Sequence, residues 1–173
     1  MQLKLLPEKT ETNRPRRLII PCFETFFDES GDRPALADGA QTILRFYESR
    51  EYDRIAIANT GHRTLSFDDL IAYFQSALQH VPWIQAIAFF YEGAGYWVTH
   101  RSAMAYVDRN LPPGDRPGIG AIWLAKHVIT SHRIDSGSLV GHSDVDMRAA
   151  LASWCDYLDF NLDFNFLKED FCE

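Results

Sequence analysis

The chain has 173 residues, the length of one domain, and 46% of them are hydrophobic and 24% charged. These fractions exclude a chain that is disordered throughout. Lys and Arg number 17 against 24 Asp and Glu, and the net charge of −7 argues against broad contact with nucleic acid or an anionic membrane. No apolar run reaches the ~20 residues of a membrane span, and the N-terminus lacks an apolar signal core. We therefore expect a cytoplasmic protein.

The first third of the chain predicts a strand, a helix and a second strand after a basic, flexible N-terminal segment at residues 1–16. Residues 18–20 form a short apolar run that ends at Pro21, which predicts a buried strand. Residues 41–49 have apolar side chains at helical spacing, and residues 54–58 are an apolar run that predicts a strand leading into a turn.

The middle of the chain begins with a helix signal. Ser66 is an expected N-cap with Asp69 three positions later, and the apolar spacing continues to residue 78. A third strand is predicted at residues 84–90. Glycine and proline in residues 91–117 predict a long loop with a short helix.

The last third predicts an amphipathic helix at residues 119–128, a strand at 138–141, a helix at 146–154 and a strand at 156–160. Short apolar strands that alternate with helices indicate a mainly parallel sheet with helices on both faces, a three-layer α/β/α sandwich. Ligands of such sheets bind at the carboxyl ends of the strands. Candidate functional residues are therefore those that directly follow each strand.

Four segments with regular spacing lie at or near these strand ends. They read Pro-Cys-Phe-Glu-Thr from Pro21, Ala-Asn-Thr-Gly from Ala58, Asp-Arg-Pro-Gly-Ile-Gly from Asp115 and Gly-His-Ser-Asp-Val-Asp from Gly141. Their order, spacing and flanks resemble the motifs of the haloacid dehalogenase superfamily of phosphohydrolases, especially small polynucleotide 3′-phosphatases and histidinol-phosphate phosphatases. The resemblance covers residues 17–167 and implies a Rossmann-like domain without a large cap domain, followed by an acidic end at residues 168–173.

The first motif of that family is Asp-x-Asp-x-Thr, in which the first Asp attacks phosphorus and the second handles the leaving-group proton. Here Pro21 and Phe23 stand at the two Asp positions, and only Thr25 matches. Proline has no nucleophilic side chain and phenylalanine carries no exchangeable proton. Catalysis by the family's mechanism is therefore not expected.

The other motifs are degenerate as well. Asn59 replaces the hydroxyl residue of the second motif and is followed by Thr60; Arg116 replaces the Lys of the third. His142 replaces an Asp that helps to hold Mg²⁺, while Asp146 remains.

We interpret the chain as a catalytically inactive relative that binds, regulates or scaffolds, with no cofactor and with an unidentified protein partner or small ligand. An anion would meet four residues of the cleft: Thr25, Asn59, Thr60 and Arg116.

The alternative is a divergent metal-dependent phosphatase that acts with Mg²⁺ on a phosphorylated small molecule or a nucleic-acid end. It would depend on Asp146, Arg116 and Glu24. A softer metal such as Zn²⁺ would use His142, Asp144 and Asp146. Cys22 points to the opposite side of its strand from Pro21 and Phe23, which favours a buried structural thiol over a nucleophile.

Two aromatic regions suggest partner contacts. Tyr91, Tyr96 and Trp97 lie beside glycines, and core packing and a binding surface are equally favoured for them. Residues 155–173 are acidic and aromatic, which predicts a solvated end with a few core anchors. Within this end, residues 160–167 resemble the family's closing strand.

Overall fold

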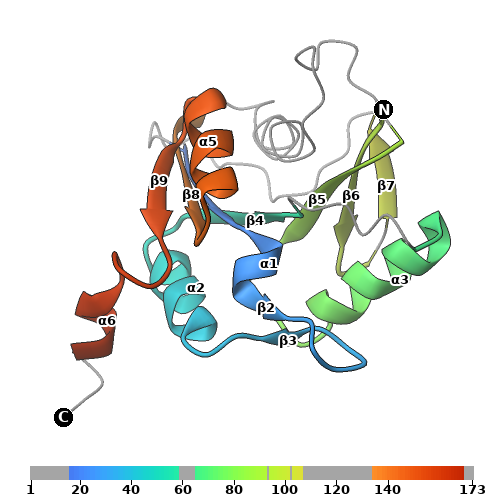
Figure 1. Cartoon of the computed structure of the whole chain (residues 1–173), viewed down its shortest axis with the longest axis horizontal. Coiled ribbons are helices and arrows are strands. Elements are labelled where there is room, and N and C mark those ends of the chain that lie inside the picture. Colours follow the sequence, from blue (N-terminus) through green and yellow to red (C-terminus); the bar gives the residue numbers. More distant parts are fainter. Residues whose placement is uncertain (1–15, 59–64, 93, 102, 107–133, 170–173) are drawn as a thin grey trace.

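The computed structural model describes residues 16–58, 65–92, 94–101, 103–106 and 134–169. They form a seven-stranded sheet in the order β7-β6-β5-β4-β1-β8-β9 and a two-stranded hairpin (Figure 1). The sheet strands are β1 (Arg16–Pro21), β4 (Asp53–Ile57), β5 (Ala86–Tyr91), β6 (Ala94–Thr99), β7 (Ala103–Tyr106), β8 (Ile134–Gly141) and β9 (Asp156–Asp159). The hairpin pairs β2 (Phe27–Asp28) with β3 (Ala35–Leu36). The helices are α1 (Phe23–Phe26), α2 (Ala40–Ser49), α3 (Phe67–Leu78), α5 (Asp144–Ala152) and α6 (Asn165–Glu169).

The strand directions confirm a mainly parallel sheet. β1 pairs in parallel with β4 on one side and with β8 on the other, and the parallel pairing continues to β5 and β9. Taken in chain order, these five strands have the spatial order 3-2-1-4-5, which is compatible with a Rossmann-like fold. The order reverses between β1 and β8. The carboxyl ends of these two strands are therefore the place where such a sheet binds its ligands.

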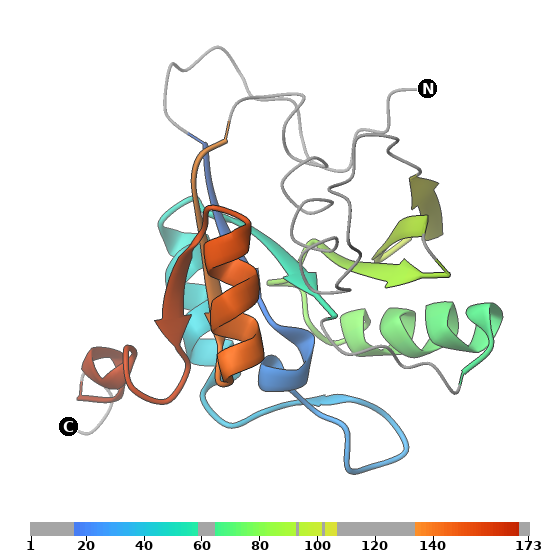
Figure 2. The same ribbon diagram turned by 45° about the horizontal axis from the view of Figure 1, so that its top comes forward.

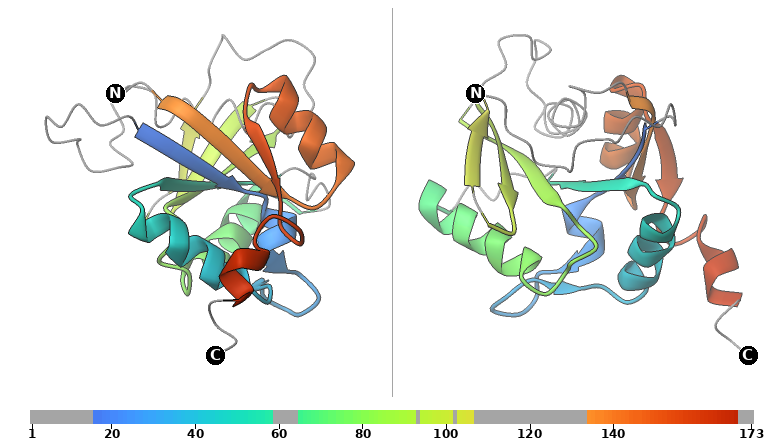
Figure 3. Two further views of the ribbon diagram at one scale, coloured as in Figure 1. Left: turned by 90° about the vertical axis from the view of Figure 1, so that its left-hand side faces the viewer. Right: turned by 180° about the vertical axis from the view of Figure 1, so that it is seen from behind.

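The alternation of side chains along the strands divides the core into two layers. Ile19 packs with residues of α2 and α3, whereas Leu18 and Ile20 pack on the other face with Ala149 and Ala150 of α5. Figure 3 shows α2 and α3 on one side of the sheet and α5 on the other. The expectation of helices on both faces is confirmed.

Serine caps set the starts of two helices. The backbone N–H of Asp69 donates to Ser66 Oγ at 3.2 Å, as the sequence predicts for α3. The backbone N–H of Asp146 donates in the same way to Ser143 Oγ at 3.2 Å. Because Ser143 is the N-cap, α5 begins at Asp144, two residues before the predicted start.

Two predictions of secondary structure are wrong. The loop predicted for residues 91–117 contains β6 and β7, since a tight turn at Glu92 (φ 47°) lets the β-favouring residues Tyr96, Trp97 and Val98 pair antiparallel with β5. The closing strand expected within residues 160–167 is also absent from the described residues, because the chain turns into α6 after β9. Phe164 and Leu167 are buried there, which confirms the expected core anchors.

The structure leaves other predictions open. The predicted helix at residues 119–128, the N-terminal segment at 1–15 and the whole region between β7 and β8 (107–133) lie outside the described residues. The expectation of no large cap domain therefore stays a prediction. Within the described part of the chain, no helix has both the length and the apolar character that crossing a membrane requires.

Candidate site at the carboxyl ends of β1 and β8

The turns after β1 and β8 meet at the point where the strand order reverses. The first turn is the short helix α1, which lies next to the start of α5 (Figure 2). It carries Thr25, whose Oγ1 is 2.5 Å from Nδ1 of His142 in the turn after β8. Two residues predicted for the site, from opposite ends of the sequence, are therefore hydrogen-bonded to each other.

The side chain of Asp146 stabilises the turn after β8 by a hydrogen bond within that turn. It is buried, and its Oδ2 accepts the backbone N–H of His142 at 3.1 Å and lies 3.9 Å from the His142 ring nitrogen Nδ1. A Cβ atom at residue 141 would lie 2.5 Å from that same Oδ2 and 2.6 Å from the Cβ of Asp146, so Gly141 permits the close approach of this side chain. The carboxylate that the resemblance retains as a metal ligand thus contacts the backbone of its own turn.

Phe23 belongs to the hydrophobic core. It is fully buried, stacks on Phe27 with ring centroids 4.5 Å apart, and meets the edge of Phe74 at 5.1 Å. Tyr73 completes the surroundings of the ring at 6.0 Å. Pro21 is buried too and pairs with Val140 of β8. The two positions at which the resemblance would place catalytic carboxylates are therefore occupied by packed side chains.

The donors present do not fit the Mg²⁺ site that the resemblance implies. Mg²⁺ prefers several hard oxygen ligands in octahedral geometry. Here one position is a proline, another is an imidazole, and Asp146 already accepts a backbone N–H. Among the residues that the structure describes, no group of three or more His, Cys, Asp or Glu side chains is arranged to hold a metal ion. Of the three residues predicted for a softer metal, His142 and Asp146 have their atoms Nδ1 and Oδ2 3.9 Å apart, and Asp144 is exposed.

The remaining predicted residues have mixed outcomes. Asn59, Thr60 and Arg116 lie outside the described residues. Glu24 is half-buried on α1, and Cys22 is buried in the face of the core that contacts α5, which confirms its packed position.

The aromatic residues predicted as a partner surface are mostly packed. Trp97 is buried in the core, so of the two alternatives left open for it the structure shows core packing. Tyr91 and Tyr96 are half-buried, and their ring centroids lie 5.4 Å and 4.8 Å from that of Phe67. The antiparallel pairing of β5 with β6 brings these two rings over α3. A prediction of the β5–β6 hairpin from the sequence would have indicated this packing.

Tyr157 was not predicted as part of this region. It lies on β9, and its pKa is raised to about 12, first by burial and then by the negative charges of Asp159 and Asp146. The pairing of Tyr157 with Leu139 of β8 places it beside the site. The sequence does not indicate that Tyr157 lies near the site, because only the strand order of the sheet shows that β9 is next to β8.

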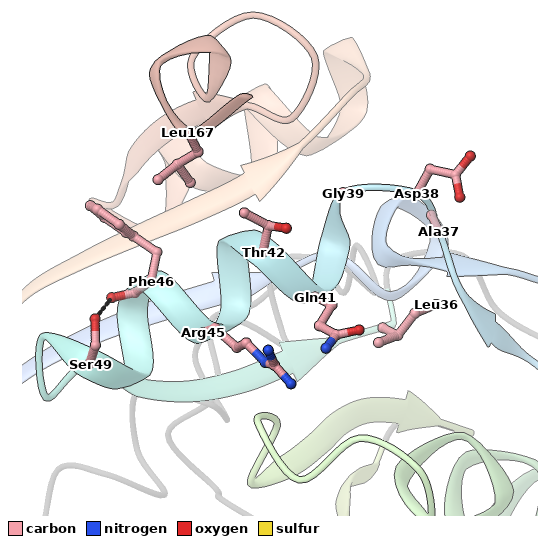
Figure 4. Close-up of a pocket in the computed structure, with 10 residues that line it drawn as sticks. All are labelled: Leu36, Ala37, Asp38, Gly39, Gln41, Thr42, Arg45, Phe46, Ser49 and Leu167. Atoms are coloured by element: carbon pink, nitrogen blue, oxygen red, sulfur yellow. Dashed lines mark hydrogen bonds between the residues drawn. The ribbon is translucent and has the colours of Figure 1, made fainter. Parts of the chain in front are cut away.

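A separate pocket of about 620 Å³ lies around α2 (Figure 4). Its walls include Leu36, Phe46 and Leu167, but none of the three residues Thr25, His142 and Asp146. Arg45 is the one cationic side chain among the described residues of its lining, and its guanidinium stacks over the Trp83 ring at 4.7 Å. Figure 4 shows Arg45 and Gln41 pointing to one side of α2 and Thr42 and Leu167 lying on the other. The polar groups of this pocket do not converge on one point.

Comparison of the chain with protein-family models, with curated proteins and with solved structures finds no match.

Proposed function

We propose that this chain is a non-catalytic binding, regulatory or scaffold module that resembles the haloacid dehalogenase phosphohydrolases in its motif order. The observation that carries the proposal is the burial of Phe23 among aromatic rings at the end of β1. That ring stands where the family's acid/base carboxylate would stand. We expect the module to act in the cytoplasm on a protein or small-molecule partner.

Chemistry supports the same proposal. Phosphoryl transfer through an acyl-phosphate needs a carboxylate nucleophile, and Pro21 offers none. A leaving alkoxide needs a proton donor, and the buried ring of Phe23 cannot supply one. Because such groups act as a unit, loss of one essential residue already removes most of the activity.

A divergent metal-dependent phosphatase is the second candidate. One observation favours it: Thr25, His142 and Asp146 meet at the reversal of strand order, where α/β proteins bind their ligands. In this case His142 and Asp146, with residues outside the described part of the chain, would form a rebuilt site.

Metal-dependent thermal unfolding separates the two candidates. The purified protein is heated with and without Mg²⁺, Mn²⁺ and Zn²⁺, and the same samples are assayed with a generic aryl phosphate. We expect superimposable unfolding curves and background turnover. A ligand that binds only the folded state stabilises it by RT ln(1 + [L]/Kd), so a metal site would raise the Tm with metal concentration. A metal-dependent shift, together with turnover that is lost in Asp146→Ala and kept in the control Asp68→Ala, which removes an exposed carboxylate on α3, would establish the phosphatase instead.

A further inference from the structure

The outer side of α5 carries apolar side chains in contact with solvent. Met147 is 38% exposed, Leu151 64% and Trp154, just beyond the end of the helix, 89%. Positions separated by four and then three residues lie on one side of a helix. We call these three residues the α5 strip. Another side of α5 packs through Ala149 and Ala150 onto the sheet, and none of the three strip residues is a member of that buried cluster.

Trp154 also has an unfavourable backbone conformation. Its φ of 60° lies in the left-handed region, which glycine adopts readily and a bulky residue does not. The turn that imposes this φ is fixed by hydrogen bonds on both sides, from the N–H of Ser153 to Ala149 and from the N–H of Cys155 to Ala150. Glycine would suit this position better for folding. A tryptophan with both backbone strain and a solvated ring is therefore unexplained by stability.

We propose that the α5 strip is a docking surface for a basic, amphipathic segment of a partner protein. The proposal rests on the proposed function of the chain as a binding module and names the surface and the partner class. Exposed large apolar residues that gather on one side of a helix are typical of interaction sites, and tryptophan is the residue most often found as an interface anchor.

The charge around the strip selects the partner. Asp144 at the start of α5 and Asp156 on β9 are exposed carboxylates at its two ends, and Arg148 is the one cation on the helix. The chain as a whole has a net charge of −7. An exposed tryptophan face attracts Lys and Arg side chains, and a nearby carboxylate adds to this attraction. A segment that alternates apolar and basic residues therefore complements both properties of the strip.

A second copy of the chain fits the strip less well. Self-association through it would bring together two chains that each have a charge of −7 and would place further carboxylates next to Asp144 and Asp156. Like charges at an interface oppose binding. The observations therefore favour a basic partner over a homodimer.

A pair of synthetic peptides tests the proposal. One is a 14-residue amphipathic helix of Leu and Lys, and the other has Glu at every Lys position. Fluorescence anisotropy of the labelled peptides measures binding to the full chain. We expect the Lys peptide to bind and the Glu peptide not to bind. Trp154→Gly and Leu151→Ser should each weaken binding by about tenfold or more, the usual effect of losing an interface anchor.

The control is Leu162→Ser, which removes a 71% exposed leucine outside the strip and should change the Kd less than about twofold. Trp154→Gly relieves backbone strain, so an unchanged or higher Tm shows that its loss of binding does not come from unfolding. Equal binding of the two peptides, or equal Kd values for the strip variants and the control, would overturn the proposal. So would a dimer in sedimentation that Trp154→Gly dissociates. Because these measurements need neither metal nor phosphate ester, they fail or succeed independently of the test for catalysis.

Discussion

Thr25 and His142 join the two turns that meet where the strand order reverses. Their atoms Oγ1 and Nδ1 lie 2.5 Å apart although the residues are 117 positions apart in sequence. The bond is part-buried and links α1, after β1, to the start of α5, after β8. Because the two groups are engaged with each other, they link the turn after β1 to the turn after β8.

Removal of the Thr25 hydroxyl tests that role. Thr25→Val keeps the shape of the side chain but leaves His142 without this partner, so we expect a loss of about 1 kcal/mol in the free energy of unfolding. Thr25→Ser retains the hydroxyl and should lose less. Urea unfolding of the three proteins at neutral pH gives the values. A Thr25→Val variant as stable as the wild type would show that the hydrogen bond contributes nothing.

Residue 23 offers a second test, because a substitution can place there the carboxylate that the resembled family has at this position. Phe23→Ala leaves a cavity between Phe27 and Phe74 and should cost about 3–5 kcal/mol. Phe23→Asp would bury an unpaired charge among aromatic rings, so we expect it to unfold the chain rather than to create a phosphatase. Circular dichroism during heating measures both effects. A folded Phe23→Asp variant with metal-dependent turnover would mean that this ring blocks a site that is otherwise intact.

Much of the fold could be predicted because its signals are local. The apolar run before Pro21, the cap at Ser66 and the helical spacing of residues 41–49 each depend on neighbours in sequence, and each appears in the structure. The hairpin of β5 and β6 was missed because Gly93 and Gly95 indicate a loop, whereas strand pairing is a long-range property. The tail could be predicted in part: the strand expected at residues 156–160 appears as β9, whereas nothing local distinguishes a further strand within residues 160–167 from the short helix α6.

The candidate site was predictable only as a set of residues. The resemblance placed Thr25, His142 and Asp146 at strand ends, but their hydrogen bonds depend on rotamers and on the approach that Gly141 permits. Phe23 is buried in the core as the first residue of the helical turn α1. An interpretation of this segment as an extended strand does not predict that orientation.

The glycines of β8 provide a matched pair for testing the Asp146 contact. A Cβ atom at residue 141 would overlap the Asp146 side chain at 2.5–2.8 Å, whereas one at residue 137 would meet only Cys155 Sγ at 3.4 Å. We expect Gly141→Ala to destabilise the chain by about 1–3 kcal/mol, the usual range for overpacking, and Gly137→Ala to cost less. Thermal unfolding of both variants measures the difference. The reverse order would mean that Asp146 does not lie against the backbone of residue 141.

Tyr47 should make the stability of the chain depend on alkaline pH. It is buried on α2 beside the rings of Tyr52 and Phe164, and burial, with a further contribution from Tyr52, raises its pKa to about 12. In the unfolded chain the group titrates near pH 10, so between about pH 10 and 12 the unfolded state loses this proton while the folded state keeps it. The free energy of unfolding must then fall as the pH rises. Tyr47→Phe cannot ionise, so the stability of the wild type relative to this variant should be constant from pH 7 to 9 and decrease by about 1–2 kcal/mol towards pH 11.5. Urea unfolding at each pH measures this difference, and a constant value over the whole range would show that Tyr47 ionises equally in both states.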